Sequence, residues 1–255
     1  MPHSKPVNSQ TGNVSTMAEN ATRLIDFDEG GSEALVHQRP DSLDPLAAAA
    51  LAAPQTVPDQ AAAPPPTIPR HPYLLGRDTC ALVVVDMQAP FLNAIFERER
   101  LTQNVLLLCR AAALLNVPAI ATVQYAERMG GLVPEVADAL PAGTADLALD
   151  KMCFSCAGSD AFLDALAQTG RRQILLCGLE THICVSQTAH DLLHAGYQVH
   201  VAADAVSSRT LEKHKLGMER IRDAGARPCA AEAAVYEWLR EAGTPEFKEI
   251  LKLVR

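Results

Sequence analysis

A cysteine that follows a short apolar run is the first feature of this sequence that suggests chemistry. The apolar residues 174–177 end at Gly178, and an amphipathic stretch follows that begins near Cys184. This order predicts a strand, a tight turn and the first turn of a helix. The positive end of a helix dipole favours a thiolate, which is the nucleophilic form of cysteine. The segment therefore predicts covalent catalysis by Cys184.

Other polar residues follow predicted strands in the same way. They are Asp86 with Gln88, Gln124 with Tyr125, and Lys151. In an open parallel sheet, ligands bind beyond the carboxyl ends of the strands. A carboxylate, an ammonium group and a thiol that meet there can act as base, cation and nucleophile. Each of these residues alone has an ordinary structural explanation, so the prediction rests on their combination.

The sequence from residue 74 onward alternates short apolar runs with amphipathic stretches. The apolar runs predict strands at 81–85, 119–123, 147–149, 174–177, 199–203 and 228–230. Helical spacing predicts helices at 104–116, 161–168, 183–194, 211–224 and 232–240. Strand and helix in alternation imply right-handed crossovers. The predicted fold is a three-layer α/β/α sandwich with a mostly parallel, doubly wound sheet of about six strands.

Residues 1–72 have a different composition from the rest. They are polar at first and then run through the repeats A-A-A-A-L-A-A-P and A-A-A-P-P-P-T-I-P. Such a sequence buries too little apolar surface to offset the entropy of ordering. We therefore expect a disordered tail at 1–72 and one folded domain at 73–255.

Composition limits the partners and the compartment. The net charge of −8 argues against nucleic acids and anionic membranes as partners. No apolar run approaches the roughly 20 residues of a membrane span, and the first residues lack the apolar segment of a secretory signal. Seven cysteines scattered through apolar runs predict reduced thiols and not a disulfide framework. We expect a cytoplasmic protein.

Two other patterns offer alternatives for the site. Cys153 and Cys156 form a C-x-x-C pair that could act in redox chemistry. His190 and His194 lie four residues apart, as two zinc ligands on one helix would, but no third ligand is evident. Both patterns are weaker predictors than the set formed by Asp86, Lys151 and Cys184.

Three segments resemble the isochorismatase-like cysteine hydrolase superfamily. They are V-V-V-D-M-Q, D-K-M-C-F-S and C-G-L-E-T-H-I-C-V, which contain Asp86, Lys151 and Cys184 in that order. The stretches Q-Y-A-E-R-M-G-G-L-V-P-E, V-A-A-D-A-V-S-S-R and P-E-F-K-E-I are most similar to the isochorismatase domain-containing proteins. The resemblance covers about residues 80–255.

The resemblance implies a role for each matching residue. Cys184 would attack the electrophilic carbon of an amide-like C–N bond. Asp86 would take the thiol proton and return it to the leaving amine, and Lys151 would favour both groups as anions. A cis peptide is implied at Leu179–Glu180. It would aim the Glu180 and Cys184 N–H groups at a developing oxyanion.

The remaining site residues are expected to shape the pocket. Thr181 would hold the loop, and the candidate pocket residues are Gln88, Gln124, Tyr125, Phe154 and His182. Nicotinamidases carry D-x-H where this chain reads Gln124-Tyr125-Ala126, so no metal or other cofactor is expected. Isochorismatases proper lack the cysteine, so vinyl-ether hydrolysis is not expected.

The predicted protein is a cysteine-dependent hydrolase of a small molecule, assembled as a homo-oligomer. The alternative is a catalytically quiet interaction or scaffold protein that retains the fold.

Overall fold

The computed structural model describes residues 68–254, so the predicted disorder of residues 1–67 lies outside the described residues. Within the described part, six strands form one parallel sheet in the order β3-β2-β1-β4-β5-β6. The strands are β1 (Cys80–Val85), β2 (Ala119–Gln124), β3 (Leu149–Lys151), β4 (Gln173–Leu179), β5 (Gln198–Ser207) and β6 (Arg227–Cys229).

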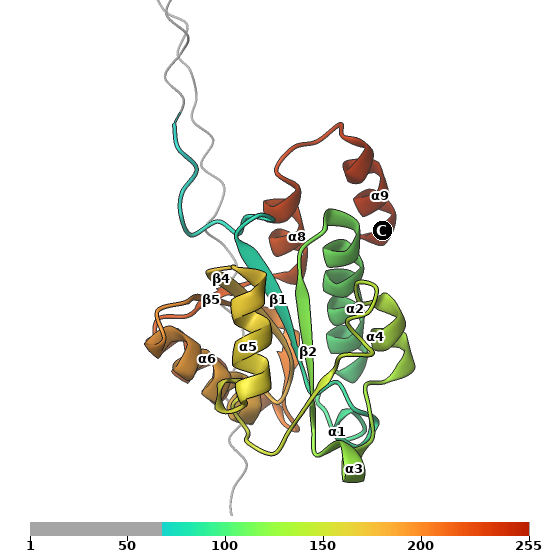
Figure 1. Cartoon of the computed structure of the whole chain (residues 1–255), viewed down its shortest axis with the longest axis vertical. Coiled ribbons are helices and arrows are strands. Elements are labelled where there is room, and N and C mark those ends of the chain that lie inside the picture. Colours follow the sequence, from blue (N-terminus) through green and yellow to red (C-terminus); the bar gives the residue numbers. More distant parts are fainter. Residues whose placement is uncertain (1–67, 255) are drawn as a thin grey trace, which may run out of the picture. The chain divides into compact units, whose positions relative to one another are not determined.

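Helices cover both faces of this sheet. In Figure 1, α5 and α6 lie on one side, and α2, α4 and α8 lie on the other. The helical elements are α1 (Ala89–Leu92), α2 (Arg98–Leu115), α3 (Ala126–Met129), α4 (Pro134–Ala139), η2 (Cys156–Gly158), α5 (Asp160–Thr169), η3 (Thr181–Val185), α6 (Ser186–His194), α7 (Leu211–Asp223), α8 (Ala231–Leu239) and α9 (Pro245–Leu253). The predicted three-layer α/β/α fold is confirmed.

The two cores explain why β1 is apolar throughout. Successive side chains of a strand point to opposite faces of the sheet. Leu82 and Val84 accordingly pack into the core on the α2 side, whereas Ala81, Val83 and Val85 pack into the core on the α5 and α6 side. All six residues of β1 are buried, as expected for a central strand of a parallel sheet.

Several elements differ from the sequence predictions. The third strand spans Leu149–Lys151, so Lys151 ends the strand and does not follow it. The helix near Cys184 begins earlier, as a π-helical turn over Thr181–Val185. The short helices α1, α3 and α4 have no predicted counterpart, because four to six residues give a weak periodic signal. The C-terminal α9 was also not predicted.

The strand order places a crevice at the carboxyl ends of β1 and β4. The chain leaves β1 toward β2 on one side, while β4 continues the sheet on the other side, which makes this a topological switch point. Gly178 brings the two strands together there, with φ 106°, and a Cβ atom on it would overlap the Val85 backbone. No residue with a side chain fits this position.

The opposite end of the sheet holds the segment that leads into β1. Gln173, nearly buried at the start of β4, donates to the carbonyls of Pro72 and Leu74 at 3.0 and 3.1 Å. Its Oε1 accepts from Gly76 N and Thr79 Oγ1 at 3.0 and 2.6 Å. We call this group the Gln173 cluster. It fastens the entry segment to the sheet through uncharged groups alone.

Contacts with the domain begin before residue 73. Arg70 Nη2 donates to the Glu237 carbonyl in α8 at 2.7 Å. The division at residues 72 and 73 stays a prediction, but residues 70–72 contact the folded part.

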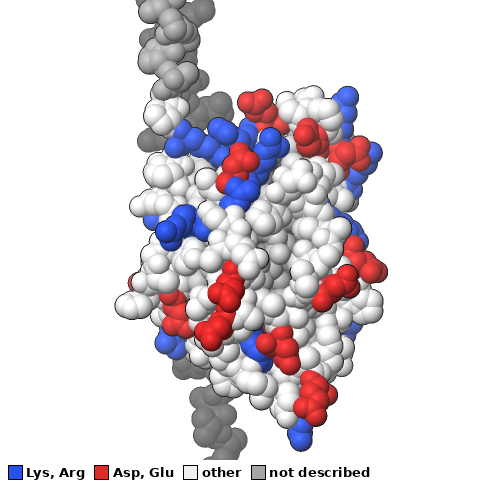
Figure 2. Space-filling model, viewed as in Figure 1, with Lys and Arg blue, Asp and Glu red and all other residues white. Residues whose placement is uncertain are grey.

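Charge is unevenly distributed on the surface. Basic side chains gather near the end of the sheet where β1 begins (Figure 2). A hollow of about 410 Å³ at this end is lined in part by Arg70, Arg77, Arg172 and Arg240. The net charge of −8 therefore does not describe every part of the surface. Among the described helices, none has the length and apolar character needed to cross a membrane.

Candidate active site

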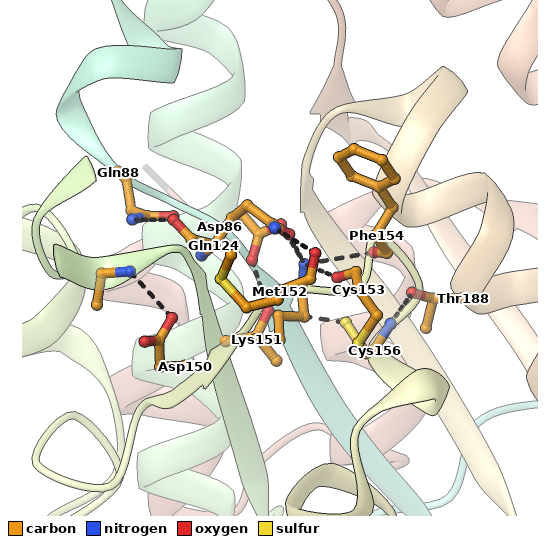
Figure 3. Close-up of polar contacts among 12 residues, drawn as sticks. Asp86, Gln88, Gln124, Asp150, Lys151, Met152, Cys153, Phe154, Cys156 and Thr188 are labelled. Carbon is orange, nitrogen blue, oxygen red and sulfur yellow. Dashed lines mark hydrogen bonds and ion pairs between the residues drawn. The ribbon is translucent and has the colours of Figure 1, made fainter. Parts of the chain in front are cut away.

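A buried ion pair lies at the carboxyl ends of the strands. Lys151 Nζ lies 2.8 Å from Asp86 Oδ2, and both side chains are almost completely buried. Asp86 directly follows β1 and has φ 50°, a left-handed conformation that Asp adopts more readily than most residues. Lys151 extends from β3 past β2 to reach Asp86, as Figure 3 shows. The fold thus joins two residues that are 65 positions apart in sequence.

The ammonium group has further acceptors. Lys151 Nζ lies 2.6 Å from Gln124 Oε1, and 3.4 and 3.3 Å from the carbonyls of Cys153 and Phe154 (Figure 3). Burial is the largest single influence and lowers the pKa of Lys151, but the charge of Asp86 and the other neighbouring groups together outweigh it, so the pKa is raised overall. Lys151 is therefore a cation at neutral pH.

Cys184 completes the set, but in a different protonation state from the one predicted. Burial, and after it the charge of Asp86, raise the pKa of the Cys184 thiol to about 12. Lys151 lowers it, as the resemblance implied, but by less. The direction of this shift is opposite to the one expected from a helix start and a nearby cation. The sequence shows the helix start and the cation, but not the burial that outweighs them.

This arrangement has a chemical consequence. The starting state is a neutral thiol beside a carboxylate, with an ammonium group on the other side of the carboxylate. A neutral thiol is a weak nucleophile and needs a base as it attacks. Asp86 pairs with Lys151 and lines the same cavity as Cys184, so it is the base available to take that proton.

The loop that carries Cys184 is held on both sides. The Leu179–Glu180 peptide bond is cis, at the bond that the resemblance implied. The buried Thr181 Oγ1 lies 3.0 Å from His214 Nδ1 of α7. The Glu180 carboxylate accepts from Arg209 N and Nε, each at 3.1 Å.

Helix α7 packs against the backbone of the same loop. A Cβ atom on Gly217 would lie 2.8 Å from both N and Cα of His182, which is closer than real Cβ contacts. Glycine at this position allows α7 to support the turn that contains Cys184. That turn is π-helical, a conformation that occurs often at functional sites.

A small cavity of about 80 Å³ opens onto Asp86 and Cys184, with Lys151 behind Asp86 and outside its lining. Its lining consists of Asp86, Phe91, Gln124, Phe154, Leu179, Glu180, Ile183 and Cys184. Phe91 and Ile183 were not among the predicted pocket residues. Ile183 could have been included because it precedes Cys184, whereas Phe91 reaches the cavity only through the short α1.

Three predicted pocket residues do not line the cavity. Gln88 is fully buried, and its amide bonds the backbone of Gln124 and the Gly130 carbonyl. Tyr125 donates its backbone N–H to the Lys151 carbonyl, and its ring lies 5.8 Å from the Arg128 guanidinium. His182 lies 2.9 Å from Ser208 Oγ. Gln88 therefore supports the strand ends, Tyr125 contacts β3 and α3, and His182 contacts the segment after β5.

The alternative patterns have partners of their own. His190 Nδ1 lies 2.7 Å from the Ser186 carbonyl of the same helix. Cys153 and Cys156 are both free thiols, and Cys156 is buried. Within residues 68–254, no group of three or more His, Cys, Asp or Glu side chains is arranged to hold a metal ion.

Comparisons with known proteins agree with the fold and with the resemblance. The family description "Isochorismatase domain" matches residues 80–233. The secreted isochorismatase effector Isc1 of Phytophthora sojae (strain P6497) is 39% identical over 185 residues, which cover 71% of this chain and 88% of that protein. Isochorismatase domain-containing protein 2 of Bos taurus is 38% identical over 176 residues, which cover 68% and 82%.

A solved structure is similar over the same part of the chain. The MAR1 ribonuclease from Caenorhabditis elegans has a TM-score of 0.66 and 33% sequence identity, covering 71% of this chain and 91% of that one. Because the family description matches more than half of this sequence and close relatives align over most of their length, the chain belongs to the isochorismatase family.

Proposed function

We propose that this protein is a cysteine-dependent hydrolase that cleaves an amide-like C–N bond of a small molecule. Membership of the family supports a hydrolase. The observation that carries the finer proposal is the position of Asp86, whose carboxylate pairs with the Lys151 ammonium and lines the same cavity as Cys184.

The proposed reaction has two half-reactions. Cys184 is acylated in the first and released in the second, and Asp86 carries a proton in each. Cys184 Sγ attacks the substrate carbonyl carbon while its proton passes to Asp86. The C–N bond then breaks, and the leaving amine takes that proton. Water attacks the resulting thioester, gives a proton to Asp86, and breaks the C–S bond, after which the thiol is protonated again.

The negative charge that develops on the substrate oxygen during attack needs hydrogen-bond donors. The resemblance implies that the backbone N–H groups of Glu180 and Cys184 donate to this oxygen. The Glu180 carbonyl accepts from the N–H groups of Ile183 and Val185 at 3.0 and 3.3 Å, which fixes the start of the turn. Lys151 pairs with the Asp86 carboxylate and so holds it beside the cavity between the two proton transfers.

The cavity supports a small substrate with an uncharged acyl group. A volume of about 80 Å³ holds only a few non-hydrogen atoms, and Phe91, Phe154, Leu179 and Ile183 contribute apolar walls. The charged groups of the lining are already paired, Asp86 with Lys151 and Glu180 with Arg209. A charged substrate would have to break one of these pairs.

Two measurements test the proposal. The first is ammonia release from a panel of small amides, ureides and imides, with Cys184→Ala as the control. The second is the rate at which iodoacetamide alkylates each cysteine, followed by mass spectrometry. A Cys153→Ser background is useful because Cys153 is the partly exposed thiol nearest the site.

The scaffold alternative predicts a different outcome. A catalytically quiet protein has no reason to keep one buried thiol reactive. If Cys184 is alkylated no faster than the buried Cys109, and no amide in the panel is cleaved, the hydrolase proposal fails and the scaffold reading replaces it.

The oligomeric state and the cellular compartment are separate from the proposed reaction. We propose a homo-oligomer, supported by the exposed apolar side chains of Met152 and Phe154 beside the cavity. The YcaC gene product of Escherichia coli, which shares the fold, is described as an octamer. The cytoplasmic location stays a prediction, because the relative from Phytophthora sojae is by name a secreted effector.

A further inference from the structure

Two buried side chains behind Asp86 have no role in the mechanism so far. They are Thr122, in the middle of β2, and Cys156, at the start of η2. Both are completely buried. Thr122 Oγ1 lies 2.9 Å from Asp86 Oδ1 and 3.7 Å from Cys156 Sγ. One hydroxyl thus joins the carboxylate to a second thiol.

The direction of both hydrogen bonds follows from the number of protons. A hydroxyl has one proton, and an ionised carboxylate can only accept. Thr122 therefore donates to Asp86, and its oxygen is left to accept from the Cys156 thiol. Cys156 retains its proton for this purpose, because burial raises its pKa to about 11. The order is thiol to hydroxyl to carboxylate.

Cys156 is itself fixed in place. Its backbone N–H donates to Thr188 Oγ1 of α6 at 2.9 Å, and Thr188 is completely buried (Figure 3). The relay is thereby anchored to the helix that directly follows the turn carrying Cys184.

We propose that Thr122 and Cys156 form a relay that orients the Asp86 carboxylate for proton exchange with Cys184. A carboxylate held at one oxygen can rotate, whereas Asp86 is held at Oδ1 by Thr122 and at Oδ2 by Lys151. Thr122 is a positioning residue, and Cys156 fixes the orientation of its hydroxyl. The inference rests on the proposed function, in which Asp86 is the base.

The relay also gives the C-x-x-C pair a non-redox explanation. Only Cys156 takes part, as a hydrogen-bond donor, and Cys153 contributes its backbone carbonyl to Lys151 instead of its thiol. A serine at position 156 should therefore replace the cysteine, which a redox role would not allow.

The test compares matched pairs in the Cys153→Ser background. Thr122→Val keeps the shape and removes the hydroxyl, whereas Thr122→Ser keeps the hydroxyl. Cys156→Ala removes the donor, whereas Cys156→Ser keeps one. The measurement is the rate of Cys184 alkylation by iodoacetamide as a function of pH, with the thermal midpoint as the check on folding.

We expect Thr122→Val to slow alkylation by about 10- to 100-fold, the effect of losing a hydrogen bond to a charged group. The pH profile of alkylation should also differ between Thr122→Val and Thr122→Ser, because only the serine keeps a hydrogen-bond donor to the carboxylate. Thr122→Ser should stay within about three-fold of the parent rate. Cys156→Ala should be slower than Cys156→Ser by about three-fold or more.

The outcomes separate this inference from the proposed function. Slow alkylation in Asp86→Asn together with equal rates and profiles in Thr122→Val and Thr122→Ser would overturn the relay and leave the mechanism in place. Unchanged alkylation in Asp86→Asn would overturn the mechanism itself. If Thr122→Val does not fold, the Cys156 pair decides, and equal rates in that pair would overturn the relay.

Discussion

The two ends of the sheet hold buried polar groups of different kinds. At the amino ends, the Gln173 cluster joins amides, carbonyls and a hydroxyl, all uncharged. At the carboxyl ends, the Asp86–Lys151 pair is ionised and almost completely buried. The polar side chains in both groups have hydrogen-bond partners, so the presence of such partners does not distinguish the two ends of the sheet.

The two arrangements differ in how much they are expected to contribute to the free energy of unfolding. Neutral hydrogen bonds in the interior contribute modestly and are costly only when one partner is left alone. A buried ion pair is weak evidence for stability, because desolvation opposes the attraction between the charges. We therefore interpret the Gln173 cluster as a structural contact that holds the entry segment on the sheet. The charged pair is better explained by the proposed proton transfer.

The largest effect is expected from removal of the base or the nucleophile. Asp86→Asn and Cys184→Ala should each reduce turnover of a cleaved amide by about a thousand-fold or more. The double variant should lose little beyond either single variant, because groups that act as a unit are not additive. Steady-state ammonia release measures this, and additive losses would show that the two residues act separately.

Removal of the cation should affect stability as well as rate. Lys151→Met leaves the Asp86 carboxylate buried without its partner, which should lower the free energy of unfolding by about 3–5 kcal/mol. It should also raise the pKa of Cys184 further and slow its alkylation near neutral pH. Urea denaturation of this variant, beside the exposed control Lys215→Met and the double variant Asp86→Asn with Lys151→Met, measures the first effect.

The double variant should recover part of the lost stability, because no unpaired charge remains buried. A Lys151→Met protein as stable as the Lys215→Met control would remove the contrast between the two ends of the sheet.

The Gln173 cluster should show the opposite pattern, with an effect on stability and none on the site. Gln173→Leu removes the partner of the partly buried Pro72 and Leu74 carbonyls and of the Gly76 N–H, and should lower the free energy of unfolding by about 1–3 kcal/mol. The alkylation rate of Cys184 should not change. Thermal denaturation with the exposed control Gln103→Leu measures the stability change. Slower alkylation of Cys184 in the Gln173→Leu variant would mean that the two ends of the sheet are coupled.

The smallest effect concerns pH. Burial raises the pKa of Cys80, Cys109 and Cys229 to about 12, from the ordinary 9.0. Between these values the unfolded chain releases protons that the folded chain keeps, so stability falls as pH rises. We expect the thermal midpoint, measured with a reductant, to fall between about pH 8.5 and about pH 10.5. Cys109→Ala should make the fall shallower, and an unchanged slope would contradict this assignment.

The fold was predictable because its central strands are apolar on both faces. Unbroken apolar runs indicated β1 and β4; Asp86 follows β1 directly, and Cys184 lies in the turn after β4. Lys151 was predictable as a residue near a strand end, although β3 is shifted relative to its apolar residues. The motifs of the family, more than periodicity, singled out these three residues.

The rest depends on three-dimensional neighbours that periodicity cannot show. Thr122 is an interior residue of an apolar strand, and nothing in its position indicates that it contacts Asp86. The raised pKa of Cys184 depends on burial by residues distant in sequence. Gln88 was predicted in the pocket because it follows a strand end, but the amide bonds neighbouring backbone instead.

Gly217 has a consequence for how the family can vary. It contributes no atom to the cavity, yet α7 approaches the His182 backbone so closely that any side chain at position 217 would push the helix and the nucleophile's turn apart. A mutational scan should therefore find a loss-of-function position on a helix outside the pocket. Variation in substrate preference must then arise on the other walls, because this side of the site tolerates no change in spacing.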